Sequence, residues 1–297
     1  MTRLPLVVGA LALVASCGED AAPPARARSE LGSRTELAFV DGIGPRVRAE
    51  VAGAGPAVLL VDTGAAYTVL SAEFAHAHGL PLEPFQARAG PTSAPGRAIE
   101  HVAVVHELAL GAARVRDVRL AVLDFAGLAL DGLDGILGQD LLRTWFVALD
   151  GPGRRLVLLP LCTLDEGFAQ LFEGRVGAVR FEPDWRLGVP LLQCRLAGAG
   201  EVELLLDTGA NFLSLPPDTI EALGLVHVGT DTRQTLDGSE ECELYELPRT
   251  SLGALTIWGK VQAWERGVLG WSALAGAVLV QDGATGLVYV LDGPPWK

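Results

Sequence analysis

Short apolar runs and alternating stretches make up most of the chain. Val58–Val61 and Val202–Leu206 are mostly apolar runs of the kind that form strands buried between layers. His101–Leu110 and Val115–Leu123 instead alternate between apolar and polar positions, which is typical of strands with one face in a core. The pattern therefore predicts short strands joined by turns and closed into a small barrel.

The same pattern occurs twice. When the chain is shifted by 145 residues, Pro45–Leu80 lies over Pro190–Leu225 without a gap, and 15 of the 36 positions are identical. This shift aligns Ala52–Gly55 with Ala197–Gly200 and Asp62–Ala65 with Asp207–Ala210. Further along the chain, at a shift of 132 residues, Ile136–Gly138 pairs with Val268–Gly270 and Asp150-Gly151 with Asp282-Gly283. Because the order of features is the same in both halves, we expect two lobes of like fold.

Local signals predict a short helix at the same place in each lobe. A capping serine or a proline pair begins each one, and a glycine ends it. The expected boundaries are Ser71 and Gly79 in the first lobe, and Pro216-Pro217 and Gly224 in the second. Further short helices are expected after Gly138 and Gly270. The first lobe then covers residues 36–160, the second covers residues 187–293, and residues 161–186 connect them.

The N-terminus is typical of a secretory signal. Arg3 precedes the apolar run Leu4–Val14, and small residues lead to Cys17. This order resembles a bacterial lipobox, so we expect residues 1–16 to be removed and Cys17 to carry the lipid. A plain signal peptide is the alternative. Residues 17–35 then form a tether or a short pro-segment. The protein is expected in the bacterial cell envelope, periplasmic or surface-facing, and Gly18 after the cysteine favours the outer membrane.

Composition and charge exclude several classes of partner. The chain of 297 residues has 23 Lys and Arg against 36 Asp and Glu, a net charge of −13. Such a surface repels polyphosphate, so we expect no nucleic-acid partner. Beyond the first twenty residues the longest apolar stretch, Gly267–Val280, is too short to span a bilayer. Cys162, Cys194 and Cys242 permit one disulfide and leave one thiol free, and the sequence leaves the pairing open.

The candidate chemistry is a pair of carboxylates, Asp62 and Asp207. Each follows a buried run and begins the same tetrapeptide, which is completed by Thr63, Gly64 and Ala65, and by Thr208, Gly209 and Ala210. Glycine allows a tight turn and a close approach, and threonine can hydrogen-bond to the opposite loop. Two carboxylates in contact share a proton, so one can act as a base on water while the other polarises a carbonyl. The alternative is that both tripeptides are merely turns of a duplicated fold.

Other chemistries lack a matching pattern in the sequence. The chain has no Gly-x-Ser-x-Gly, phosphate loop or dinucleotide fingerprint. His76 and His78 lie two apart on a predicted helix, and His101 and His106 lie five apart in a strand region, so neither pair has a metal-ligand spacing. We therefore expect no metal and no cofactor.

The two Asp-Thr-Gly-Ala segments and the later Ile136-Leu137-Gly138 and Val268-Leu269-Gly270 resemble retropepsin-like aspartic proteases, especially the bacterial families. The resemblance covers residues 36–160 and 185–293. It implies a mainly β fold of two pseudo-symmetric closed barrel lobes with the active site between them, catalysis by Asp62 and Asp207, and strands at 136–138 and 268–270 that buttress their loops. Two lobes in one chain imply a pepsin-like monomer. The second lobe departs from the pattern, because Trp271-Ser272 stands where the first has Gln139-Asp140.

The resemblance predicts an aspartic endopeptidase that cuts extended peptides. An inactive peptide-binding lipoprotein on the same fold is the alternative, and processing of the chain's own N-terminal segment is a further possibility. Gly90–Gly96 is a candidate flap over the cleft, or else an ordinary surface loop, and it contains no tyrosine. Ala65 and Ala210 offer no hydroxyl to the carboxylates, so we expect activity toward mildly acidic or neutral pH.

Overall fold

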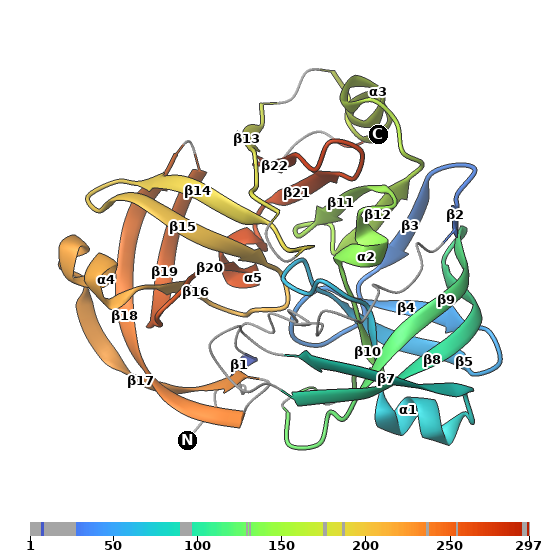
Figure 1. The fold of residues 1–297 in the computed structure, drawn as a ribbon. Coiled ribbons are helices and arrows are strands. Elements are labelled where there is room, and N and C mark those ends of the chain that lie inside the picture. Colours follow the sequence, from blue (N-terminus) through green and yellow to red (C-terminus); the bar gives the residue numbers. More distant parts are fainter. Residues whose placement is uncertain are drawn as a thin grey trace.

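The computed structural model describes residues 7–8, 28–89, 97–128, 130, 132–174, 177–185, 188–235, 238–253, 255–292 and 296. In this part of the chain, strands form two barrels and one sheet that both lobes share (Figure 1). The lipobox Cys17 and the candidate flap Gly90–Gly96 lie outside the described residues. Among the described residues, no helix has the length and apolar character needed to cross a membrane.

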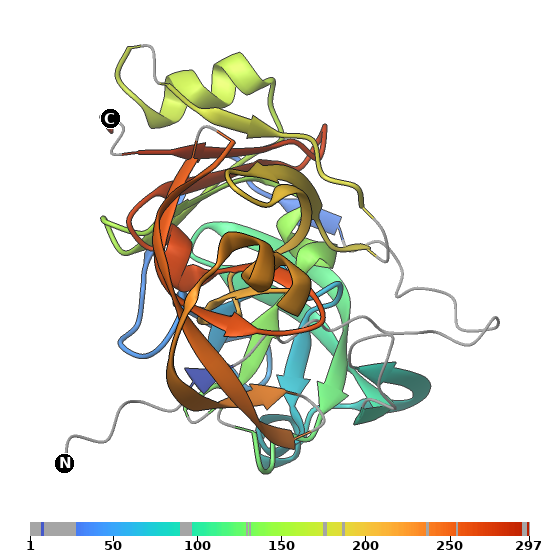
Figure 2. The same ribbon diagram turned by 90° about the vertical axis from the view of Figure 1, so that its left-hand side faces the viewer.

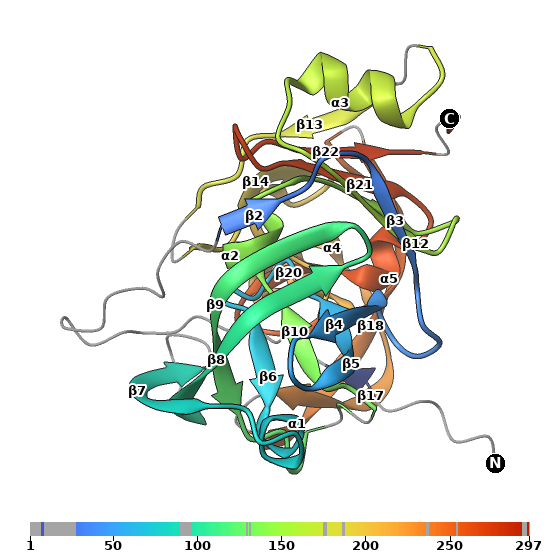
Figure 3. The ribbon, with the colours of Figure 1, turned by 90° about the vertical axis from the view of Figure 1, so that its right-hand side faces the viewer.

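The first lobe is a closed ring of six strands. Their order is β9-β6-β10-β5-β4-β8, and β8 pairs with β9 to close the ring. The bounds are β4 (Arg46–Val51), β5 (Gly55–Val61), β6 (Val69–Ser71), β8 (Arg97–Leu110), β9 (Ala113–Leu123) and β10 (Gly135–Leu137). Two more strands, β2 (Arg28–Glu30) and β7 (Leu82–Ala89), extend it by pairing with β9 and β8, and β7 and β8 form the hairpin at the lower left of Figure 3. The first lobe therefore includes residues of the predicted tether.

The second lobe repeats this ring. Its order is β19-β16-β20-β15-β14-β18, closed by pairing of β18 with β19, so that each strand has a counterpart in the first lobe. The bounds are β14 (Leu191–Leu196), β15 (Gly200–Asp207), β16 (Leu213–Leu215), β18 (Gly238–Leu252), β19 (Leu255–Ala263) and β20 (Gly267–Gly270). The strand β17 (Val226–Thr235) pairs with β18 as β7 pairs with β8, and β1 (Val7–Val8) lies parallel to β17. The mainly β fold of two like lobes is confirmed.

A six-stranded sheet joins the lobes, with the order β13-β22-β21-β11-β12-β3. Its bounds are β3 (Thr35–Ala38), β11 (Phe146–Asp150), β12 (Arg155–Leu159), β13 (Val179–Phe181), β21 (Val278–Asp282) and β22 (Val288–Leu291). At its centre β11 and β21 run antiparallel, with Ala148 opposite Val280. Helix α3 (Leu164–Leu171) covers its outer face, at the top of Figure 2. Because β13 occupies the place that matches β3, the duplication extends into the connecting segment, where the sequence shows no repeat.

The predicted helices are present. Helix α1 (Ala72–Ala77) begins at Ser71, whose side chain accepts a hydrogen bond from the Phe74 N–H, and Gly79 follows its end with a φ of +60°. Helix α4 (Pro217–Leu223) ends at Gly224, which is left-handed with a φ of 59°. The short helices α2 (Gln139–Leu142) and α5 (Trp271–Leu274) follow Gly138 and Gly270. Cys162, Cys194 and Cys242 are free thiols, so the disulfide that their number permits does not form among them.

Candidate active site

Each aspartate lies at the C-terminal end of a strand that pairs in parallel with its neighbour, β5 with β10 and β15 with β20. Asp62 follows β5, and its N–H donates to the Leu137 carbonyl of the neighbouring β10 at 3.0 Å. Asp207 ends β15 and lies opposite Gly270 of the neighbouring β20. The structure thus places the predicted buttressing segments, Ile136–Gly138 and Val268–Gly270, beside the two loops. Each segment ends in a glycine that lies directly against the backbone of the adjacent aspartate loop. A Cβ on Gly138 or Gly270 would lie 2.5 Å or less from a backbone atom of that loop, so no larger residue fits.

The threonines of the two loops bind each other's strands. The Thr63 hydroxyl donates to the Leu206 carbonyl at 2.9 Å and accepts from the Thr208 N–H at 3.0 Å. The Thr208 hydroxyl donates to the Val61 carbonyl at 2.7 Å and accepts from the Thr63 N–H at 3.1 Å. These four buried bonds obey the two-fold symmetry of the lobes, and they hold the loops face to face as the sequence predicted.

Each glycine of the tetrapeptides lies against the opposite carboxyl. A Cβ on Gly64 would lie 2.5 Å from the Asp207 carboxyl carbon, and a Cβ on Gly209 would lie 2.5 Å from that of Asp62. No side chain fits in either space, so these positions require glycine for close approach rather than for an unusual backbone angle. The two carboxyl groups are consequently brought together at the interface between the lobes.

Both carboxyl groups are fully buried, and each is only partly satisfied. One oxygen of Asp62 accepts from the Gly64 N–H at 2.8 Å, and one oxygen of Asp207 accepts from the Ala210 N–H at 2.9 Å. The second oxygen of each, Oδ2, is buried and receives no hydrogen bond from a described donor. A proton shared between the two groups would satisfy both.

Burial governs the ionisation of the pair. It raises the pKa of Asp62 well above the usual range, and the neighbouring charge of Asp207 raises it further. Burial also raises the pKa of Asp207. Ala65 and Ala210, which follow the glycines, are buried and have no side-chain donor that would stabilise the ionised forms. The pair therefore retains a proton at a higher pH than two exposed aspartates would.

Helix α2 supplies polar contacts that sequence reasoning did not assign to the site. Gln139 is buried and donates to the Thr63 carbonyl at 3.1 Å and to Gln281 of β21 at 3.1 Å. Asp140 accepts from the Thr68 hydroxyl at 2.6 Å and from its N–H at 2.8 Å, and burial raises the pKa of this carboxyl to about 6. The sequence offered two signals for this network: Gln139-Asp140 where the second lobe has Trp271-Ser272, and the polar Gln281 within the apolar run of β21.

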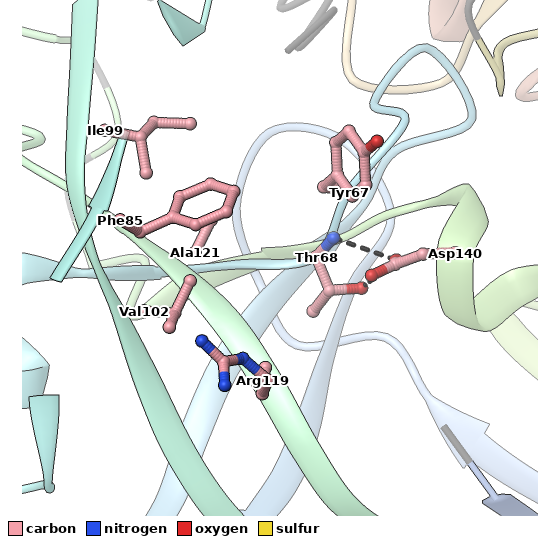
Figure 4. A pocket seen from close by; sticks show the side chains of 8 residues that line it. All are labelled: Tyr67, Thr68, Phe85, Ile99, Val102, Arg119, Ala121 and Asp140. Atoms are coloured by element: carbon pink, nitrogen blue, oxygen red, sulfur yellow. Dashed lines mark hydrogen bonds between the residues drawn. The ribbon is translucent and has the colours of Figure 1, made fainter. Parts of the chain in front are cut away.

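A small cavity lies beside the Asp62 loop (residues 62–68, between β5 and β6), and between the β7–β8 hairpin and α2. Its volume is about 10 Å³, which is the space of a single water molecule. Figure 4 shows the ring of Phe85 and the side chain of Ile99 on one side of it and Tyr67, Thr68 and Asp140 on the other. Among the described residues, no three His, Cys, Asp or Glu side chains form a group that could hold a metal ion.

Comparison with known proteins agrees with this geometry. A protein-family model described as "Aspartyl protease" matches residues 47–141 and 192–265, which together are more than half of the chain. The two matched regions lie in the two lobes, and each contains one of the aspartates. A search of curated proteins found no match.

Proposed function

We propose that this chain, which belongs to the retropepsin-like aspartyl protease family, is an aspartic endopeptidase acting through Asp62 and Asp207. The observation that carries the proposal is the pair of buried carboxyl groups on duplicated loops, each with one oxygen that lacks a donor. Burial without an ion-pair partner costs free energy, and a fold has little reason to bear that cost twice unless the pair has a use.

The chemistry follows from one shared proton. The ionised carboxyl takes a proton from a water molecule as that water attacks the carbonyl carbon of a peptide bond. The protonated carboxyl gives its proton to the carbonyl oxygen, so that no free oxyanion forms. In the collapse of the tetrahedral intermediate, the carboxyl that is now ionised takes a proton from one hydroxyl as C=O re-forms and the C–N bond breaks. The other carboxyl gives its proton to the leaving amine, and the pair is again singly protonated. The threonine bonds between the loops hold the carboxyl groups in place during these steps.

A protein that binds peptides without cutting them is the alternative on this fold. Loss of one aspartate would favour it. Instead, both tetrapeptides are intact, although 21 of the 36 gap-free aligned positions differ between the halves. The internal comparison therefore favours the enzyme.

The test compares the wild-type soluble domain with Asp62→Asn and Asp207→Asn by mass spectrometry of a peptide library. We expect each variant to lose at least about 10³-fold in kcat/KM, and the double variant to lose no more, since the two groups act as one unit. The matched control is Asp117→Asn, because Asp117 is exposed and lies outside the site. If the wild type cuts nothing and the Asn variants bind peptides equally well, the binding module is correct.

We also propose that Cys17 carries a lipid anchor in the bacterial cell envelope, since the lipobox order at the N-terminus supports it. Acylation adds apolar chain to a protein whose described helices do not span a membrane. Cys17→Ser should therefore move the protein from the membrane fraction to the soluble fraction on an immunoblot of fractionated cells. Continued sedimentation of Cys17→Ser with membranes would contradict the anchor.

A further inference from the structure

Two buried glutamines connect the lobes and contact Thr63, the residue after Asp62. Gln139 lies on α2 of the first lobe, and Gln281 lies on β21, the second lobe's central strand in the shared sheet. The Gln139 amide donates to the Gln281 carbonyl oxygen at 3.1 Å, and the Gln281 amide donates back to Gln139 at 2.8 Å. Their exposed fractions are 1% and 3%. The large majority of buried side-chain amides in folded proteins have hydrogen-bond partners, and these two amides satisfy each other.

The pair is tied to the Asp62 loop. The same Gln139 nitrogen that binds Gln281 also donates to the Thr63 carbonyl at 3.1 Å. Because a carbonyl can only accept, this contact fixes which end of the Gln139 amide points at the loop, and the orientation of Gln281 follows. A continuous path of hydrogen bonds thus runs from the shared sheet through both glutamines to Thr63, whose hydroxyl binds the opposite loop.

Among the described residues, this path occurs at the Asp62 loop and has no equivalent at the Asp207 loop. The alignment of Gly138 with Gly270 and of Asp150 with Asp282 places Trp271 opposite Gln139 and Leu149 opposite Gln281. Leu149 is buried and apolar, and the Trp271 ring packs edge-on against Phe39 with 5.9 Å between ring centroids.

A second contact from α2 is also one-sided. Asp140 binds the N–H and the hydroxyl of Thr68, whereas the aligned residues in the second lobe are Ser272 and Leu213. Leucine has no hydroxyl to offer, so the bond to the Thr68 hydroxyl has no counterpart. Among the described residues, helix α2 therefore holds the Asp62 loop by side-chain hydrogen bonds from Gln139 and Asp140, and no such bond is seen from α5 to the Asp207 loop.

We propose that Gln139 and Gln281 are positioning residues that hold the Asp62 loop rigid and keep water out of it. The two aspartate loops, although related by a duplication, are then held by different numbers of side-chain contacts. The expected effect of the two glutamines on catalysis rests on the proposed function. The titration of the pair offers a test that needs no activity. The charge of Asp207 acts on Asp62, and the Asp62 side chain hydrogen-bonds to Asp207. The other carboxyl group bound to the Asp62 loop is Asp140 of α2, which contacts Thr68.

The variant that tests the proposal is Gln139→Met with Gln281→Met. Replacing both partners leaves no unpaired amide, and methionine keeps the length of the side chain. We expect kcat to fall about tenfold or more while KM changes less than about twofold, since the loop and not the cleft is disturbed. The matched control is Leu149→Met at the symmetry-related position, for which we expect both constants to stay within about twofold of the wild type.

The second readout is the titration of the aspartate carboxyls, followed by NMR of protein with ¹³C-labelled aspartate and assigned with Asp62→Asn and Asp207→Asn. A loosened loop admits water, and burial is the main cause of the raised pKa values, so the apparent pKa values of the pair should fall by about 0.5 unit or more. Leu149→Met should leave them unchanged.

The outcomes separate this inference from the proposed function. If the wild type cuts no peptide but the titration shifts in the double methionine variant, the proposed function fails and the positioning role stands. If kcat and the titration both match the wild type, the positioning role is wrong. Should the double variant not fold, Gln281→Met alone must show the same changes at smaller size, and no change in it would overturn the proposal.

Discussion

Ala65 and Ala210 are the residues that set the environment of the two carboxyl groups most directly. Both are buried, and each follows the glycine that contacts the opposite aspartate. Because alanine has no hydroxyl, the hydrogen bonds to the carboxyl groups come from the backbone, from Gly64 and Ala210. Few interactions therefore stabilise the ionised form of either aspartate, and burial keeps both pKa values raised.

The first prediction at this scale concerns pH. In the proposed mechanism the pair acts with one proton, and raised pKa values place that state at higher pH. A serine hydroxyl at both positions would favour ionisation and lower the pKa values, so Ala65→Ser with Ala210→Ser should move the kcat/KM optimum down by about 0.5–1 unit. Ala75→Ser, in the buried part of α1, controls for a hydroxyl placed in the core. An unmoved optimum would contradict this account.

The paired loops belong to both lobes, because the end of each strand takes hydrogen-bond partners from the opposite lobe as well as from its own. The Val61 carbonyl and the Thr63 N–H of the first lobe find partners only in the hydroxyl of Thr208 among the bonds described above, and the reverse holds for the second lobe. The loops are therefore one structural unit made from two halves of the chain.

Thr208→Val tests that unit. Valine matches the shape of threonine but leaves a buried carbonyl and a buried N–H without their partner, so the free energy of unfolding should fall by about 2–4 kcal/mol. Thr208→Ser keeps the hydroxyl and should lose clearly less. Urea denaturation measures both variants, and Thr63→Val should resemble Thr208→Val by symmetry. Equal stability of the valine and serine variants would rule out the cross-link as a source of stability.

At the scale of the whole molecule, the shared sheet joins the lobes permanently. Each lobe contributes three strands, and the central pair β11 and β21 is matched along all five residues of each strand. A single chain thus supplies both aspartates and the sheet that aligns them.

We therefore expect a monomer to be active. Activity per molecule should not change over a wide range of protein concentration, with the oligomeric state followed by analytical ultracentrifugation. A mixture of Asp62→Asn and Asp207→Asn sharpens the test, because each monomer then lacks one carboxyl and the mixture should stay inactive. Activity regained on mixing would show that the site forms between two chains.

The sequence by itself determined the duplication, the pairing of the two aspartates and the ends of the short helices. These features depend on residues that are identical at a fixed shift, such as Asp62 and Asp207, or on local backbone preferences, such as those of Ser71 and Gly224. Both kinds of signal can be read without knowing which distant residues meet.

Only the tertiary structure decided how the lobes are joined and how unequally the loops are held. The strand β13 matches β3 in place but not in sequence, because a strand at the edge of a sheet needs only a few suitable backbone positions. Gln139 and Gln281 are 142 residues apart, and their partnership breaks the internal repeat instead of following it. A hydrogen bond between two residues far apart in the sequence leaves no repeated pattern in a single chain, since only folding brings the two amides together.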